Sequence, residues 1–243
     1  MTDGDRRPGV AITARGLTDY MHMFDLDDAA LTQRSFLDCA SGASAFGAQV
    51  RLRGGTVISV DPAYSSSVET IRERVQTNLA GARSWLMQRD AAINWDYLGS
   101  ARAYIATSTM GLDLFSYDYT AHRHHYVVGA LPRIPLPDNV VDVALCANYL
   151  FAYGELTDAA QTAAAIAELA RVARSHVLIH PLRHRCGAPV DDLDPVLDQL
   201  SAQDLSVEIS TPSASWLVNA QTLRVSRQQR RATAPPQHTI HDG

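Results

Sequence analysis

Short runs of apolar residues recur along this 243-residue chain and alternate with segments of helical spacing. The runs do not alternate apolar with polar residues, so we expect strands that are covered on both faces. Strands that alternate with helices in this way favour a parallel sheet with helices on both sides, an α/β fold. The predicted strands are SFLDCA (35–40), TVISVD (56–61), YVVGAL (126–131), VDVALCA (141–147), HVLIHPL (176–182), 205–210 and 221–227.

A long stretch without a strand signal follows the second predicted strand. Residues 65–121 show helical spacing, with Ile71, Val75, Leu79 and Leu86 along one side, so we predict a helical insertion there. The last two strands are joined by the turn-rich STPSAS, which favours a hairpin at the edge of the sheet. Helical or irregular structure is expected at 17–33, and helices at 44–53, 158–173 and 192–203.

We divide the chain into an N-terminal segment at 1–34, a domain at 35–227 and a tail at 228–243. Residues 1–15 are expected to be loosely held, and the polar, proline-bearing tail predicts disorder. The first residues, MTDGDRRPGV, lack the apolar core of a signal peptide, and no run approaches the roughly 18 apolar residues of a membrane span. These features predict a soluble, cytoplasmic protein.

Charge and cysteine content exclude several classes of protein. The formal net charge is −5, and no basic patch with interleaved aromatic residues is evident, so we expect no nucleic acid partner. The three cysteines, Cys39, Cys146 and Cys186, are odd in number and widely spaced, which disfavours a disulfide framework. Cys39 and Cys146 lie in predicted strands and are expected to be buried free thiols.

The stretch FLDCASGASAFGAQVRLRGGTVISVDPAY (36–64) predicts a strand, a turn of small residues, a helix and a second strand that ends in an acid. The small residues from Ala40 to Ser44 let a ligand approach the backbone closely, and the following helix offers free N–H groups. Asp61, at the end of the second strand, can accept both hydroxyls of a ribose. Because these groups meet at the carboxyl ends of the strands, we predict a nucleotide-type site there.

This stretch resembles the class I S-adenosylmethionine-dependent methyltransferases. Their first motif is D/E-x-G-x-G-x-G, in which Asp38 and Gly42 match, and Ala40 and Ser44 replace the outer glycines. Their second motif matches at Asp61 in SVDPAY.

Later blocks of the family follow in the expected order. PRIPLPDNVVDVALCANYLFAY (132–153) resembles the block around the fourth strand, and HVLIHPL matches the fifth strand. More narrowly, DYMHMFDL (19–26), followed by the D-x-x-x-G-x-S loop, resembles an uncharacterised bacterial branch of the family.

The resemblance implies a Rossmann-like three-layer sandwich with a mostly parallel seven-stranded sheet whose last strand is antiparallel. It implies S-adenosylmethionine as cofactor, with Asp38 near its amino-acid end, Gly42 where the cofactor lies against the protein backbone, and Asp61 on the ribose. Pro62, next to Asp61, is also expected to contact the cofactor. The family often has an acid near position 130 that contacts the adenine amino group. Ala130 stands there, so backbone groups at Ala130 or Leu131 would serve.

NAD is the main rival cofactor for this small-residue loop. The spacing G-x-G-x-x-G fails, because Gly42 is followed next by Gly47. Asp38 could also be a strand-end residue that caps the turn.

Histidines are the candidate general bases. His180 falls near the end of the fifth strand, where structural hydrogen bonding is the alternative, and His122, His124 and His125 form a cluster before the third strand. No acid or cysteine partner is spaced to complete a metal site with this cluster, so we predict no metal and keep His180 and His125 as base candidates.

Two groups of residues are candidates for contacts with the substrate. Asn148 and Tyr149 follow the fourth strand, where the family places cofactor and substrate, although a helix cap and core packing are their alternatives. Tyr20, Met23 and Phe24 precede the first strand and are predicted to form a lid, with core packing as the other reading.

The predicted function is methyl transfer from S-adenosylmethionine to a small molecule, with the aromatic-rich insertion closing over a partly apolar acceptor. Two alternatives remain: a non-catalytic subunit that keeps the fold to bind a partner, and an enzyme that uses S-adenosylmethionine for other chemistry. We expect no membrane partner, and a homodimer stays open.

Overall fold

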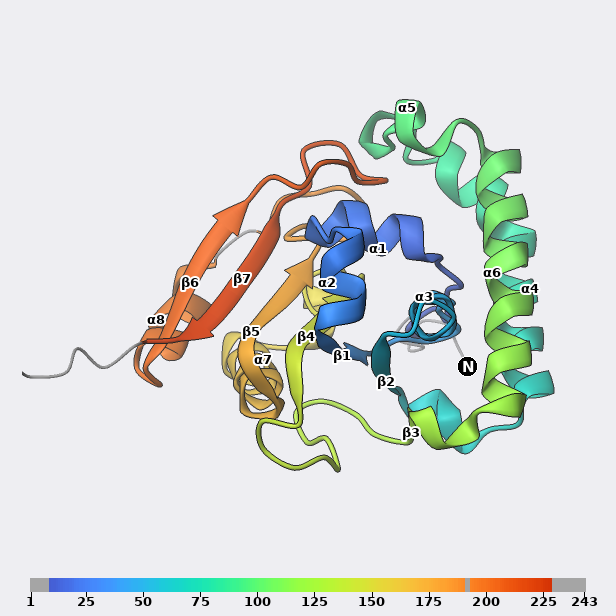
Figure 1. Cartoon of the computed structure of the whole chain (residues 1–243). Helices are drawn as coiled ribbons and strands as arrows, with labels where there is room; N and C mark the ends of the chain where they lie inside the picture. Colours follow the sequence, from blue (N-terminus) through green and yellow to red (C-terminus); the bar gives the residue numbers. More distant parts are fainter. Residues whose placement is uncertain (1–8, 191–192, 229–243) are drawn as a thin grey trace, which may run out of the picture.

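A computed structural model describes residues 9–190 and 193–228, and these residues form a seven-stranded sheet flanked by helices (Figure 1). The strand order is β3-β2-β1-β4-β5-β7-β6. Neighbours from β3 to β5 pair in parallel, and β7 pairs antiparallel with both β5 and β6. The strands are β1 (Ser35–Cys39), β2 (Thr56–Val60), β3 (Tyr126–Val127), β4 (Val141–Ala147), β5 (Ala173–His180), β6 (Leu205–Ser210) and β7 (Thr222–Arg227).

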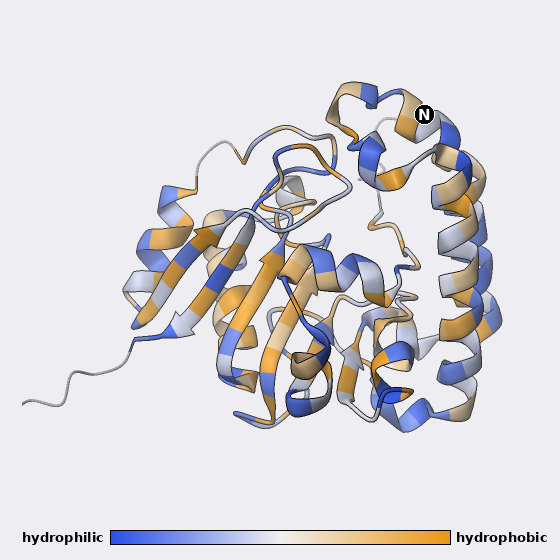
Figure 2. Cartoon of the chain, turned by 45° about the horizontal axis from the view of Figure 1, so that its top comes forward, coloured by the Kyte–Doolittle hydropathy of each residue, from blue (hydrophilic) through white to orange (hydrophobic). Residues whose placement is uncertain are grey.

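This topology confirms the predicted fold class, including the antiparallel last strand and the edge hairpin. Apolar residues colour the central strands, because helices cover both of their faces (Figure 2). The helices are α1 (Leu17–Phe24), α2 (Asp28–Gln33), α3 (Phe46–Arg51), α4 (Val68–Met87), α5 (Trp95–Leu98), α6 (Ala101–Ala121), α7 (Ala159–Val172) and α8 (Asp194–Ser201).

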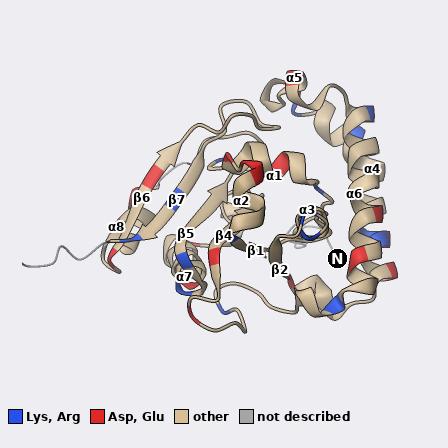
Figure 3. Ribbon diagram, viewed as in Figure 1, with Lys and Arg blue, Asp and Glu red and all other residues tan. Residues whose placement is uncertain are grey.

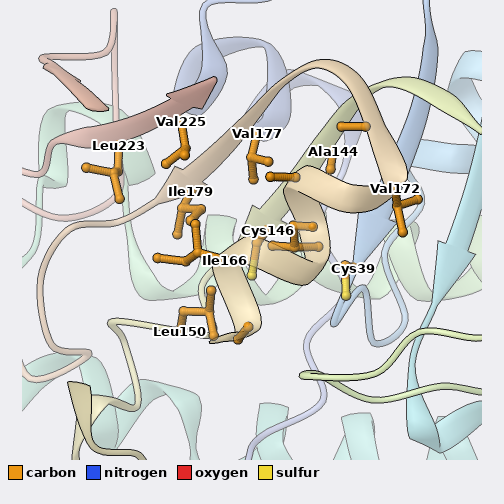
Figure 4. Close-up of a cluster of buried hydrophobic side chains, with 14 of the residues drawn as sticks. Cys39, Ala144, Cys146, Leu150, Ile166, Val172, Val177, Ile179, Leu223 and Val225 are labelled. Atoms are coloured by element: carbon orange, nitrogen blue, oxygen red, sulfur yellow. The ribbon is translucent and has the colours of Figure 1, made fainter. Parts of the chain in front are cut away.

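Two hydrophobic clusters hold the three layers together. On one face, α7 and α8 pack against β1, β4, β5 and β7 through residues such as Cys39, Cys146 and Ile166 (Figure 4). On the other face, α1, α2 and α3 pack through residues such as Phe36 and Phe46. Cys39 and Cys146 are buried free thiols, as predicted, and Cys186 is exposed.

The predicted helical insertion is the pair α4 and α6, with the short α5 between them. They stand beside α3 at the β2–β3 side of the sheet (Figure 1). The pair is held to the sheet by a third cluster that includes Tyr64, Ile71, Phe115 and Tyr126. Charges of both signs are interspersed along α4 and α6 (Figure 3). Within the described part of the chain, no helix is both long enough and apolar enough to cross a membrane.

The third strand is shorter than predicted. It spans only Tyr126–Val127, whereas the apolar run 126–131 predicts six residues of strand. The segment that follows carries Pro132, Pro135 and Pro137, and a proline offers no N–H to a strand ladder.

The N-terminal segment differs from the prediction that residues 1–15 are loose. Residues 1–8 lie outside the described part, but residues 10–15 form a packed segment that we call the strap. Ile12 and Ala14 are buried, and the carbonyl of Thr13 accepts a hydrogen bond from the Ala43 N–H at 3.1 Å. The predicted disorder at 228–243 falls almost entirely outside the described residues.

Candidate functional site

A cavity of about 270 Å³ opens at the carboxyl ends of β1, β2 and β4. The order of the strands reverses between β1 and β4, and such a switch point is where open α/β sheets bind their ligands. The lining residues come from the loops after four strands, from the strap and from α4. They include Val10, Ala11, Ile12, Thr13, Ala40, Gly42, Asp61, Pro62, Arg74, Gly129, Ala130, Leu131, Ala147, Asn148 and Tyr149.

The turn after β1 has a strained residue at its start. Ala40 has φ 57° and Gly42 has φ 56°, both in the left-handed region. A Cβ atom on Gly42 would lie 3.3 Å from the Thr13 carbonyl oxygen. The absence of a side chain at Gly42 therefore lets the strap pack closely against this turn. Ala40 occupies a conformation that costs an L-residue roughly 1–2 kcal/mol.

Replacing Ala40 with glycine is therefore expected to stabilise the fold by about 1 kcal/mol, because relief of the strain exceeds the added entropy of the unfolded chain. Urea unfolding measures this change. Ala43→Gly is the matched control, since Ala43 is buried in the same turn and is not left-handed. Equal destabilisation by both substitutions would show that Ala40 is not strained.

Asp61 is anchored at the edge of the cavity by the backbone. Its Oδ2 accepts a hydrogen bond from the Gly42 N–H at 2.9 Å, and its Oδ1 accepts one from the Ala63 N–H at 2.8 Å. Burial raises the pKa of this carboxyl, while the two N–H groups and the charge of Arg74 act in the opposite direction. A carboxylate has about four acceptor positions, so Asp61 can still accept hydrogen bonds from a ligand.

Asp38 lies beneath the cavity and does not line it. The carboxyl is fully buried, its Oδ1 accepts a hydrogen bond from the Tyr20 hydroxyl at 2.9 Å, and its Oδ2 has no hydrogen-bond partner. Burial raises the pKa of Asp38 to about 7. Ser44 is also buried, and its hydroxyl accepts a hydrogen bond from the Phe46 N–H rather than facing the cavity.

The predicted lid residues belong to the core. Tyr20, Met23 and Phe24 are 2%, 2% and 5% exposed, and the Tyr20 ring stacks on Phe46 with centroids 4.4 Å apart. They face the sheet because α1 lies flat on it. The prediction that they form a lid is therefore wrong, and they pack in the core instead. The cover over the cavity is instead the strap, and its apolar residues Val10, Ala11 and Ile12 were the available signal in the sequence.

Neither candidate histidine reaches the cavity. His180 is 1% exposed, and its two ring nitrogens lie 3.0 Å from the Thr222 hydroxyl and 2.9 Å from the Ser215 hydroxyl. Burial lowers the pKa of His180 to about 3, so it is a neutral structural group.

His125 lies in the turn Arg123–His125, which precedes β3 at the amino ends of the strands, opposite the cavity. Burial and the charge of Arg51 lower its pKa. In the parts of the chain that are described, no three His, Cys, Asp or Glu side chains are grouped to hold a metal ion.

Asn148 separates the first cavity from a second one. Its backbone is left-handed, with φ 56°, and its Oδ1 accepts a hydrogen bond from the Trp216 indole N–H at 2.7 Å. The second cavity has a volume of about 330 Å³ and shares Ala11, Thr13 and Asn148 with the first. Tyr149 lines the first cavity only. Arg74 and Trp216 also line the cavities, and no local pattern in the sequence marks them, because they come from separate segments.

Comparisons with known proteins give one relative in sequence and several in structure. No family model matches the chain. An uncharacterised protein of the archaeon Methanocaldococcus jannaschii is 24% identical over 193 residues, which cover 79% of this chain and 86% of that protein. The narrower resemblance to a bacterial branch therefore stays a prediction.

The solved structures that resemble this chain include two methyltransferases. The magnesium protoporphyrin IX methyltransferase of Synechocystis PCC 6803, with bound S-adenosylmethionine, has a TM-score of 0.45 and 12% identity, covering 83% of this chain and 73% of that one. An S-adenosylmethionine-dependent methyltransferase of Aquifex aeolicus has a TM-score of 0.39 and 16% identity, covering 82% and 93%.

Proposed function

We propose that this chain is an S-adenosylmethionine-dependent methyltransferase that acts on a small molecule. The observation that carries the proposal is the pair of adjoining cavities at the switch point of the sheet, one edged by Asp61 and the other walled by aromatic rings. The motif resemblance supports the same cofactor, since Ala40, Gly42 and Asp61 all line the first cavity.

The residues of the first cavity fit an adenosyl cofactor. Asp61 would accept the ribose hydroxyls, and the segment from Gly129 to Leu131 would provide backbone groups and apolar contact for the adenine. The unpartnered Oδ2 of Asp38 marks an acceptor behind the turn. Asp38 would act on a bound cofactor through the shape of the turn rather than by lining the cavity.

When bound, the cofactor supplies an activated sulfonium methyl, so the protein contributes mainly alignment and exclusion of water. Asn148 stands at the boundary between the cavities, where donor and acceptor would meet. No histidine is among the described residues that line either cavity. An amine that arrives deprotonated would need no general base, whereas an oxygen acceptor would have to give its proton to another group.

Calorimetric titration with S-adenosylmethionine and S-adenosylhomocysteine tests the proposal. We expect saturable one-to-one binding of both ligands, and no binding of NADH under the same conditions. A well-folded protein that binds neither adenosyl ligand would overturn the proposed function. Binding of NADH alone would move the assignment to an oxidoreductase.

A further inference from the structure

The second cavity is walled by aromatic rings from four separate segments. Trp85 of α4 and Trp216 of the β6–β7 connection have ring centroids 5.9 Å apart at an interplanar angle of 43°. Tyr104 of α6 and Tyr153 after β4 complete this wall. Trp216 is only 7% exposed, and its bond to Asn148 holds the indole beside the first cavity. Rigid rings at such a position favour a flat ligand.

The same cavity carries uncompensated positive charge. Arg15 of the strap and Arg185 after β5 both line it, and no Asp or Glu is among its described lining residues. The guanidinium of Arg15 lies 5.4 Å from the Trp216 ring centroid, and that of Arg185 lies 5.0 Å from the Tyr153 centroid. Among the side chains that the structure describes, neither arginine forms an ion pair.

Contact with the rings does not satisfy these two charges by itself. A guanidinium gains from an aromatic face, but its planar set of N–H donors remains unused. The Nε of Arg15 is buried and has no hydrogen-bond partner. Paired N–H donors of this kind match the two oxygens of a carboxylate or phosphate. The rings therefore suit a flat aromatic part of a ligand, and the arginines suit an anionic group on the same ligand.

We propose that the second cavity binds a flat aromatic molecule that carries a carboxylate or a phosphate. The ring lies against Trp85 and Trp216, and the anion pairs with Arg15 and Arg185. That this molecule is the methyl acceptor rests on the proposed function, because the boundary at Asn148 would bring it to the cofactor. The selectivity of the cavity for an aromatic anion does not rest on the proposed function.

The test is a set of calorimetric titrations with matched probes, performed with and without S-adenosylhomocysteine. The probes are 2-naphthoate, 2-naphthyl phosphate, the neutral 2-naphthamide and the non-aromatic cyclohexanecarboxylate. We expect at least one aromatic anion to bind about tenfold or more tightly than both the amide and the cyclohexane acid. The stronger of the two aromatic anions identifies a carboxylate or a phosphate as the natural group.

Arginine variants then test the assignment of the charges. Arg15→Gln and Arg185→Gln are each expected to reduce the preference for the anion over the amide by roughly tenfold. Arg174→Gln is the matched control, because Arg174 pairs with Asp142 near the amino end of β5, at the opposite edge of the sheet. It should leave the preference unchanged.

The outcomes separate this inference from the proposed function. Equal binding of acid and amide, no binding of any probe, or a preference that survives both arginine substitutions would overturn the inference, while binding of S-adenosylhomocysteine would still support the methyltransferase. Arginine-dependent binding of an aromatic anion without any binding of the adenosyl ligands would support the cavity assignment and overturn the proposed function.

Discussion

Replacing Asp61 with asparagine is expected to weaken the binding of S-adenosylhomocysteine by at least roughly a hundredfold. The carboxylate would lose charge-assisted hydrogen bonds to two ribose hydroxyls, each worth about 1.5–3 kcal/mol when a charged group is involved. An asparagine also places an NH₂ group against one of the N–H donors of Gly42 and Ala63, which now hold the two carboxylate oxygens. Calorimetry on folded wild-type and variant protein measures the change.

A second pair of ligands distinguishes direct contact from distortion of the turn. The wild type should prefer adenosine to 2′,3′-dideoxyadenosine, because a site built to bind hydroxyl groups rejects a ligand that lacks them. Asp61→Asn should lose this preference. A variant in which the turn is merely distorted would instead bind both ligands more weakly by the same factor.

Asp138→Asn is the matched control for Asp61→Asn. Asp138 is exposed, pairs with Arg171, and lies just before β4 at the opposite edge of the sheet. It should leave the affinity unchanged. Retention of wild-type affinity by Asp61→Asn would remove Asp61 from the cofactor site.

The second large effect concerns the stability of the fold at different pH. The pKa of Asp38 is about 7 in the folded protein, against an ordinary value of 3.8. Between these two values the folded state holds a proton that the unfolded state has released, so this group lowers the free energy of unfolding as the pH rises from about 4 to 7. At about 1.4 kcal/mol per pKa unit, the full effect is on the order of 4 kcal/mol.

Asp38→Asn should remove this loss, since the amide cannot ionise and its oxygen can still accept the Tyr20 hydroxyl. The unfolding free energy of the variant minus that of the wild type should therefore grow between pH 4.5 and 8, as measured by urea denaturation. The difference is the informative quantity, because His176 and His180, whose pKa values are lowered to about 4 and about 3, act in the opposite direction below pH 6.5. These histidine contributions cancel in the subtraction.

Asp142→Asn provides a control of opposite sign. Hydrogen bonds from Ser35 lower the pKa of Asp142, so its stabilisation is present at neutral pH and is lost as the pH falls through the folded pKa. The loss of stability caused by Asp142→Asn should shrink in acid, because the wild-type Asp142 carboxylate becomes protonated there. The gain in stability from Asp38→Asn should also shrink in acid, because the unfolded wild type then keeps the proton on Asp38 as the folded state does. A pH-independent difference for Asp38→Asn would mean that folding does not raise the pKa of Asp38.

The sequence by itself determined the sheet and one side of the site. Parallel strands buried on both faces must be continuous apolar runs, and a turn of small residues followed by an acid-ended strand is a local pattern. Ala40, Gly42 and Asp61 could therefore be placed at the carboxyl edge of the sheet, because the position of a strand's end is determined by neighbouring residues in the chain.

Only the tertiary structure decided which side chains face a cavity. The apolar face of a helix such as α1 can cover a ligand or a sheet equally well, and the direction in which it packs assigned Tyr20 to the core. His180 finds its hydroxyl partners at Ser215 and Thr222, far along the chain. The aromatic, positively charged cavity joins Arg15, Trp85 and others from separate loops and helices. Contacts between residues that are distant in the sequence depend on how whole helices and strands pack, and no local sequence pattern specifies that packing.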